Sequence, residues 1–271
     1  MSATKDTKLS TAVDTEIAAH DAWRKERHEA LTGPTGNLSL TLTRWLPAGT
    51  TADEAAAQVA DARAEDAPGV KVTELQRRNI STGEPEYGLR VWDANSAAIQ
   101  AFERVDTFDY NPDWVIDATF TPVAADRTVP FEHIRDAGGT RDLIVPGDIT
   151  FERDGQTFTL AAFDDDGTLL LVFGDQTNTA TDDSQTYGAG RFLFVEFTDA
   201  ASGGEIAAGE ERIAGAPVRL DFNRAFVPPC GYSAQYNCPM PPPQNRLPWA
   251  VTAGEKQPRF AGGFDIYDAL I

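Results

Sequence analysis

The chain has 271 residues, and its 41% hydrophobic content is enough to bury the core of one large β domain or of two small ones. Its 42 acidic and 23 basic residues give a formal net charge of −19, which disfavours nucleic acid and anionic membranes because both attract clustered Lys and Arg. The chain has neither a signal-peptide-like start nor an apolar run of about eighteen residues, so we expect a cytoplasmic protein that does not span a membrane.

A helix and then a strand are expected at the start of the chain. Residues 14–31 carry an incomplete apolar stripe that stops before Gly33, which predicts a helix lying across a larger body. Leucines alternate with polar residues over 37–46, the pattern of a half-buried strand. We expect residues 1–34 to form an N-terminal helical segment.

Helix and strand signals then alternate. Thr51 and Glu54 have the spacing of a capping box, which predicts a short helix after them. Strand-like runs follow at VKVTEL and YGLRVW. We expect residues 35–106 to form a mixed α/β segment packed on the core.

From about Phe108 onward the pattern is that of closely spaced β-strands. Asp154 and Gly155 separate two alternating runs and predict a hairpin, because both positions of a type I′ turn need positive φ. The strand-like runs are DWVIDATFTPV, GDITFERDGQTFTLAAF, TLLLVF, RFLFVEF and PVRLDFN. Turns rather than helices join them, so we expect a mainly β fold, α+β at the margin. The predicted architecture is an antiparallel β-sandwich or barrel over 107–271, with an N-terminal helix and a long proline-rich C-terminal loop.

Motifs for metals and cofactors fail their templates. A calcium loop at AFDDDGTLLLVF would place Ala162 and Phe173 where carboxylates are needed. YGAGRFL has a strand rather than a helix after its glycines, so it cannot hold a dinucleotide. We therefore predict no metal site and no cofactor.

Both cysteines lie in the proline-rich segment, and their state is left open. Cys230 and Cys238 would need two further ligands to hold a metal ion. As free thiols they suit a reducing cytoplasm. As a disulfide they would close a small loop that cytosolic reductants could open.

Three stretches resemble a known family, "domain of unknown function 1684". They are GDQTN…TYGAGRFLFV, RLDFNRAFVPPCGYS…CPMPPPQNRLPWAVTAGEK and, more loosely, WRKERHEAL…GNLSLTLTRWL. The resemblance covers most of the chain and is strongest over 168–256. It implies no catalytic residue, cofactor or substrate.

Several positions that match the family's pattern lie at predicted strand ends. Tyr187 and Arg191 begin one strand, and Asp221 and Asn223 end another. If these strands are antiparallel neighbours, the four residues meet under the proline-rich segment. The candidate ligand-binding residues are Asp175, Tyr187, Arg191, Asp221, Asn223, Cys230 and Tyr232.

Two interpretations of this group stay open. In the structural one, Arg191 pairs with Asp221, Asn223 satisfies turn amides, and the proline-rich loop covers a sheet edge. In the functional one, Arg191 binds a carboxylate or phosphate, and Tyr187 or Tyr232 supplies an aromatic wall.

The sequence favours a β domain that binds a small anionic metabolite. One alternative is a structural or protein-interaction module whose CPMPPPQNR segment is bound as a polyproline II ligand. Another is a hydrolase or isomerase that uses Asp175 or Asp221 for proton transfer. Exposed sheet edges are compatible with a homodimer.

Overall fold

The computed structural model describes residues 2–64, 67–79, 82–124, 126–165, 167–198 and 215–268, with side chains from residue 13 on except that of residue 64. The chain forms two compact units, each assembled from separate stretches. Unit 1 comprises Met1–Trp23, Val105–Pro228 and Pro239–Gln257. Unit 2 comprises Arg24–Arg104, Pro229–Cys238 and Pro258–Ile271. The three-part domain division expected from the sequence stays a prediction.

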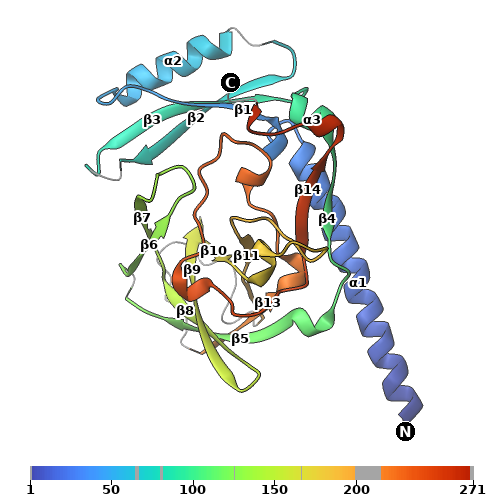
Figure 1. Cartoon of the computed structure of the whole chain (residues 1–271). Helices are drawn as coiled ribbons and strands as arrows, with labels where there is room; N and C mark the ends of the chain where they lie inside the picture. Colours follow the sequence, from blue (N-terminus) through green and yellow to red (C-terminus); the bar gives the residue numbers. More distant parts are fainter. Residues whose placement is uncertain are drawn as a thin grey trace. The chain divides into compact units, whose positions relative to one another are not determined.

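A seven-stranded antiparallel sheet, curved into a nearly closed barrel, is the centre of unit 1 (Figure 1). Its strand order is β11-β10-β9-β8-β5-β13-β12. The strands are β5 (Val115–Pro122), β8 (Gly147–Arg153), β9 (Gln156–Asp165), β10 (Thr168–Phe173), β11 (Arg191–Phe194), β12 (Glu196–Phe197) and β13 (Ala216–Asp221). A separate ribbon pairs β6 (Thr128–Glu132) with β7 (Thr140–Ile144). The predicted mainly β, antiparallel, barrel-like fold is confirmed.

The β8–β9 hairpin forms at the predicted turn. Asp154 has φ +52° and Gly155 has φ +74°, the positive values that a type I′ turn requires. In the next turn Gly167 N donates to Asp164 Oδ1 at 2.7 Å, as expected of a solvated hairpin turn. Asp166, which lies between Asp165 and Gly167 in this turn, is outside the described residues.

The run RFLFVEF, expected as one strand, is broken at Val195. Its first half, β11, pairs with β10, while its second half, β12, pairs with β13 at the other end of the sheet order. Val195 N donates to Leu169 O at 3.0 Å where the two halves separate. One run of alternating residues thus contributes to both ends of the sheet.

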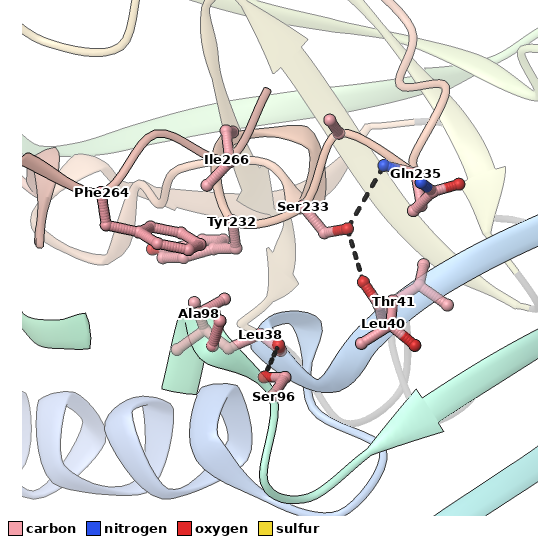
Figure 2. A pocket seen from close by; sticks show the side chains of 12 residues that line it. Leu38, Leu40, Thr41, Ser96, Ala98, Tyr232, Ser233, Gln235, Phe264 and Ile266 are labelled. Carbon is pink, nitrogen blue, oxygen red and sulfur yellow. Dashed lines mark hydrogen bonds between the residues drawn. The ribbon is translucent and has the colours of Figure 1, made fainter. Parts of the chain in front are cut away.

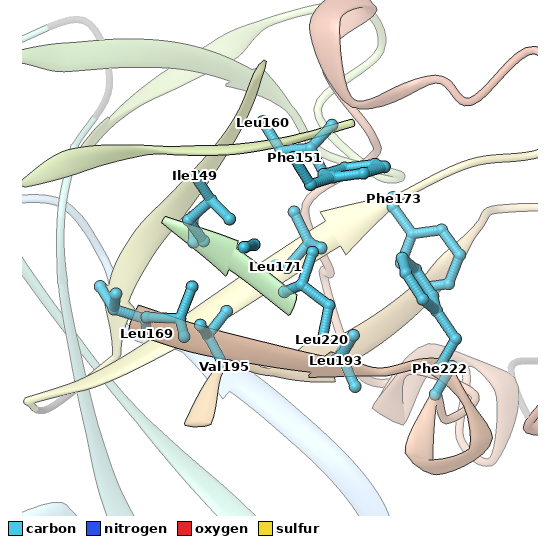
Figure 3. Packing of buried hydrophobic residues seen from close by; sticks show 14 of the residues in the cluster. Ile149, Phe151, Leu160, Leu169, Leu171, Phe173, Leu193, Val195, Leu220 and Phe222 are labelled. Carbon is cyan, nitrogen blue, oxygen red and sulfur yellow. The ribbon is translucent and has the colours of Figure 1, made fainter. Parts of the chain in front are cut away.

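The barrel interior is filled by aliphatic and aromatic side chains (Figure 3). The labelled members are Ile149, Phe151, Leu160, Leu169, Leu171, Phe173, Leu193, Val195, Leu220 and Phe222. On β10, every residue from Leu169 to Phe173 is buried, whereas an alternating strand would expose half of them. Segments of unit 1 therefore cover both faces of this strand.

Unit 2 contains a three-stranded antiparallel sheet of order β1-β3-β2. Its elements are β1 (Leu40–Trp45), α2 (Ala52–Ala64), β2 (Val70–Arg78), β3 (Pro85–Asp93) and α3 (Ala97–Ala101). Val59 of α2 packs on Val72 and Leu89, so α2 covers one face of the sheet. The predicted capping box is present, since Thr51 N donates to Glu54 Oε2 at 2.8 Å.

The strand expected over 37–46 is shorter and irregular. Asn37–Ser39 forms a 3-10 turn, and a bulge between Leu40 and Leu42 shifts the register of β1. Leu42 is consequently 40% exposed, although its alternation with Leu40 had suggested burial of both.

Three elements contain residues of both units. The N-terminal helix α1 runs from Ser2 to Thr32, longer than the predicted 14–31. β4 (Phe102–Thr107) and β14 (Glu255–Phe260) form a two-stranded sheet. Among the described residues, α1 and the other helices are all too short or too polar to cross a membrane.

Candidate functional site

Asp175 and Arg191 form a fully buried ion pair in unit 1. Arg191 Nη2 lies 2.8 Å from Asp175 Oδ2, and both side chains have 0% exposure. The terminal nitrogens of Arg191 also donate to the carbonyls of Val251, Ala253 and Glu255. Only Nε lacks an acceptor, and that atom is buried. The guanidinium therefore has no terminal N–H left to offer a ligand.

Asp175 is held by the 3-10 turn that it caps, Gln176–Thr179. Its Oδ1 accepts from Thr177 N at 2.8 Å, Thr177 Oγ1 at 2.6 Å and Val251 N at 3.1 Å. Asn178 completes the capping box by accepting from Asp175 N at 2.7 Å. Because both carboxylate oxygens are occupied, the geometry argues against the proton-transfer role considered for Asp175.

The ion pair between Arg191 and Asp221 expected in the structural interpretation is wrong. The partner of Arg191 is Asp175, and Asp221 instead lies 3.5 Å from Arg224. The two predicted strands are antiparallel neighbours only in part, since the β12 half of the first pairs with β13 while the β11 half, which begins at Arg191, pairs with β10. The wrong ion pair has a simple cause: alternation identifies strands but says nothing of which side chains meet between them.

Asp221 and Asn223 satisfy backbone groups of a turn. Asp221 Oδ1 accepts from Asn223 N at 3.1 Å and from Asn223 Nδ2 at 2.9 Å. The Asn223 amide then binds both backbone groups of Asn111, at 2.8 Å and 3.0 Å. His20 Nε2 lies 3.0 Å from Asn223 O. This is the turn-satisfying role of the structural interpretation.

Tyr187 is half-buried beside the same capping turn. Its carbonyl accepts from Asn178 Nδ2 at 2.9 Å and from Gly190 N at 3.1 Å. These two hydrogen bonds involve the backbone of Tyr187, and the proposed aromatic wall at this position stays a prediction.

His133 is buried in unit 1 and is not placed for acid–base work. It is 7% exposed, and its Nδ1 lies 3.0 Å from Phe131 O. Burial lowers the pKa of His133, so the imidazole is neutral near neutral pH. The nearby Asp136 is held by Arg141 through two contacts, at 2.8 Å and 3.1 Å.

The proline-rich segment from Pro239 on belongs to unit 1 and is packed within it. Pro241 and Pro242 are buried, and Met240 N donates to Glu132 O at 2.7 Å. A polyproline II ligand must present its prolines to a partner. The burial of these two prolines therefore argues against that role for the segment.

Gly190 permits the close approach of this segment. Its φ is +93°, and a Cβ there would lie 2.5 Å from Pro241 Cγ and 2.7 Å from Phe173 O. A larger residue would clash with both and adopt an unfavourable backbone conformation.

Asn245 joins two strands of the barrel through its side chain. The β9–β10 ladder ends at the pair Leu171–Ala162. Just beyond it, Asn245 Oδ1 accepts from Ala161 N at 2.9 Å, while Nδ2 donates to Ala161 O at 2.7 Å and to Val172 O at 2.8 Å. The amide thus replaces a missing rung of the sheet.

The two cysteines, which belong to unit 2, are free thiols in the structure. Both are buried, and Cys230 N lies 3.3 Å from Cys238 Sγ. Hydrogen bonding to the Cys230 thiol, followed by burial, raises the pKa of Cys238. Among the described residues, no group of three or more His, Cys, Asp or Glu side chains could hold a metal ion.

This raised pKa predicts a loss of stability in alkali. The folded state binds the Cys238 proton more tightly than the unfolded chain does. This difference stabilises the folded state fully below the unfolded pKa of about 8.5, and the stabilisation declines as the pH rises above it. Urea unfolding at about pH 7.5 and about pH 9.5 should show the wild type losing roughly 1 kcal/mol more than Cys238→Ala. Identical pH dependences in the two proteins would contradict the assignment.

A pocket of about 200 Å³ lies wholly within unit 2 (Figure 2). Its walls come from four stretches of the chain: Leu38, Leu40, Thr41, Ser96, Ala97, Ala98, Tyr232, Ser233, Ala234, Gln235, Phe264 and Ile266. Tyr232 and Phe264 lie on one side, and Leu38, Leu40 and Ala98 lie across from them. Eight of these twelve residues are hydrophobic and none is charged, so the interior suits an uncharged, largely apolar group.

The serine hydroxyls of the pocket are committed to the protein. Ser96 Oγ donates to Leu38 O at 2.7 Å and accepts from the N-terminus of α3. Ser233 Oγ donates to Leu40 O at 2.7 Å and accepts from Gln235 N at 3.2 Å. These bonds, drawn in part in Figure 2, fix the walls.

The predicted ligand-binding residues do not gather in one place. Asp175, Tyr187, Arg191, Asp221 and Asn223 belong to unit 1, whereas Cys230 and Tyr232 belong to unit 2. Of the seven, only Tyr232 lines the pocket. Phe264 and Ile266 were missed, because no local pattern distinguishes them from ordinary packing residues.

Known proteins match part of this chain. A family model described as "Protein of unknown function (DUF1684)" matches residues 100–256. The solution NMR structure of an uncharacterized protein from Haloarcula marismortui is 31% identical, covers 58% of this chain and 77% of that chain, and has a TM-score of 0.41. No curated protein matches the chain. All seven predicted ligand-binding residues lie in the matched range, but of the pocket walls only Tyr232–Gln235 do.

Proposed function

The chain belongs to the DUF1684 family of proteins of unknown function, and on that premise we propose that it binds a small, largely apolar molecule in the pocket of unit 2. The observation that carries the proposal is a preformed cavity with apolar walls from four separated stretches of chain. Core packing normally closes such spaces, because each unfilled volume forfeits contacts. A cavity kept open between fixed walls is typical of a ligand site.

The size of the cavity limits the ligand. About 200 Å³ equals the liquid volume of about seven water molecules, below the range of drug-sized pockets. The apolar part of the ligand is therefore a short chain or a small ring. Tyr232, which is fully buried, offers it a rigid aromatic surface.

The pocket also differs in chemistry from the anion site expected at Arg191. Arg191 is engaged on both terminal nitrogens, whereas the pocket walls hold no charged side chain. The walls alone therefore recognise apolar surface, and any charge on the ligand must be met by residues beside them.

Filling the pocket should abolish binding. Ala98 lies half-buried in α3 at the wall, so Ala98→Phe places a ring in the cavity. Titration of hexanol, followed by NMR chemical shifts of unit 2, should give saturable binding to the wild type. In the variant, binding should weaken by at least about tenfold because the apolar contact area is lost.

The matched control is Ala57→Phe, which adds the same ring at an exposed position of α2. It should bind hexanol like the wild type. Equal binding by Ala98→Phe, or shifts confined to unit 1, would overturn the proposal.

A further inference from the structure

Arg90 of β3 has no acidic partner in the part of the chain that the structure describes. Its Nε is buried with no hydrogen-bond partner, and neither an ion pair nor a hydrogen bond engages its terminal nitrogens. By contrast, Arg77 on the neighbouring strand bonds Glu86 at 2.6 Å, and Arg191 bonds Asp175 at 2.8 Å.

The residues directly opposite Arg90 explain why it is unpaired. In the sheet register Arg90 faces Thr43 of β1 and Thr73 of β2. The Thr73 hydroxyl accepts from Trp92 Nε1 at 2.9 Å, whereas Thr43 Oγ1 is buried with no partner. A cationic donor and a hydroxyl donor thus lie side by side on one face, about 5 Å apart at Cβ, and both lack an acceptor.

The groups packed around Arg90 supply no negative charge. The guanidinium lies 5.1 Å from the Tyr236 ring centroid and 5.9 Å from that of Trp92. Burial raises the pKa of Tyr236, and its hydroxyl donates to Asn37 Oδ1 at 3.2 Å, so the phenol stays neutral. Cys238 is likewise a neutral thiol, since hydrogen bonding to Cys230 and burial raise its pKa. Two aromatic walls and a neutral thiol leave the arginine charge for an external anion.

Arg90 and the pocket share one face of the sheet. The pocket residue Leu40 pairs with Trp92 in the register, and Thr43 pairs with Arg90, so these four side chains point to the same side. Gln235 joins the two places, because it lines the pocket and its Oε1 accepts from Thr43 N at 2.9 Å. Thr43 is two residues along the strand from the pocket residue Thr41, which separates their Cα atoms by about 7 Å.

We infer that Arg90 and Thr43 form an anion subsite beside the pocket, and that the ligand is a small carboxylate whose apolar tail fills the pocket. The inference rests on the proposed function. Arg90 donates to the carboxylate in a charge-assisted pair, and the Thr43 hydroxyl donates a further hydrogen bond. The distance from the subsite to the pocket matches the length of a short-chain carboxylate. Such a ligand is a small anionic metabolite, the class that the sequence favoured, but it is bound at Arg90 rather than at Arg191.

The test compares hexanoate with hexanol, which share a tail and differ in the head group. Wild-type protein should bind hexanoate at least about tenfold more tightly than hexanol, since hydrogen bonds to a charged group are the stronger ones. Arg90→Gln should remove that preference and leave hexanol binding unchanged. Thr43→Val should reduce the preference to a smaller extent, and Arg90→Lys should retain part of it.

Arg219→Gln is the matched control. Arg219 Nε is also buried without a partner, but the acidic Asp117 and Glu196 stand opposite it in the sheet, whereas two threonines stand opposite Arg90. This variant should bind both probes as the wild type does. If Arg90→Gln keeps the preference for hexanoate, the proposed anion subsite is excluded, but the proposed pocket is not. If the wild type binds neither probe, the pocket itself is wrong.

Discussion

Replacing Asp175 with Asn is expected to lower the free energy of unfolding by about 3–5 kcal/mol, the usual cost of breaking a buried ion pair. The substitution keeps the shape of the side chain but removes its charge. Arg191 would remain fully buried, with neutral carbonyls on its terminal nitrogens and Glu255 as the remaining carboxylate that acts on it. Burial already lowers the pKa of Arg191, and the Asp175 carboxylate is the main influence that opposes this. Without that carboxylate, most of the offset to the cost of desolvating the guanidinium is lost.

Urea unfolding followed by circular dichroism measures this loss. The control is Asp154→Asn in the β8–β9 turn, where the side chain is exposed and asparagine tolerates positive φ equally well. That variant should change stability by no more than about 0.5 kcal/mol. A loss below about 1 kcal/mol for Asp175→Asn would show that the pair does not hold unit 1 together.

Replacing Asn245 with Ala should destabilise the barrel by about 3 kcal/mol or more. The change leaves Ala161 N, Ala161 O and Val172 O without the partners that the amide supplies. Each buried polar group left unsatisfied costs about 1–3 kcal/mol. Water cannot readily replace the amide, because Asn245 is fully buried.

Gln244→Ala removes a neighbouring amide that is exposed, and it should leave stability within about 0.5 kcal/mol of the wild type. Hydrogen exchange gives an independent readout, because the Ala161 N–H should lose protection in Asn245→Ala. Unchanged protection at Ala161 would contradict the role assigned to Asn245.

Much of the fold follows from local patterns in the sequence. The Asp154–Gly155 turn, the Thr51–Glu54 capping box and most strands of the barrel all formed where alternation and turn chemistry predicted them. These features depend on residues close together in the chain. β4 and β14 were not predicted, because they pair with each other from distant parts of the chain. β6 and β7 pair with each other locally, but a proline in TVPFE and two charged residues in TRDLI weaken their strand signal.

The candidate site was harder to predict, since its walls are not local. Strand ends indicated Arg191 as a ligand-binding group, yet Asp175 and the carbonyls of Val251 and Ala253 occupy it. The pocket unites residues near Leu38, Ser96, Tyr232 and Phe264 in space. Only Tyr232 among these was selected from the sequence, and that selection came with the proline-rich segment around it.

The most direct test is a crystal structure of the protein soaked with hexanoate. We expect density for the tail between Leu40 and Phe264, with the carboxylate within hydrogen-bonding distance of Arg90 and Thr43. Density for hexanoate elsewhere on the protein with this pocket empty, or a pocket closed by its own side chains, would contradict it.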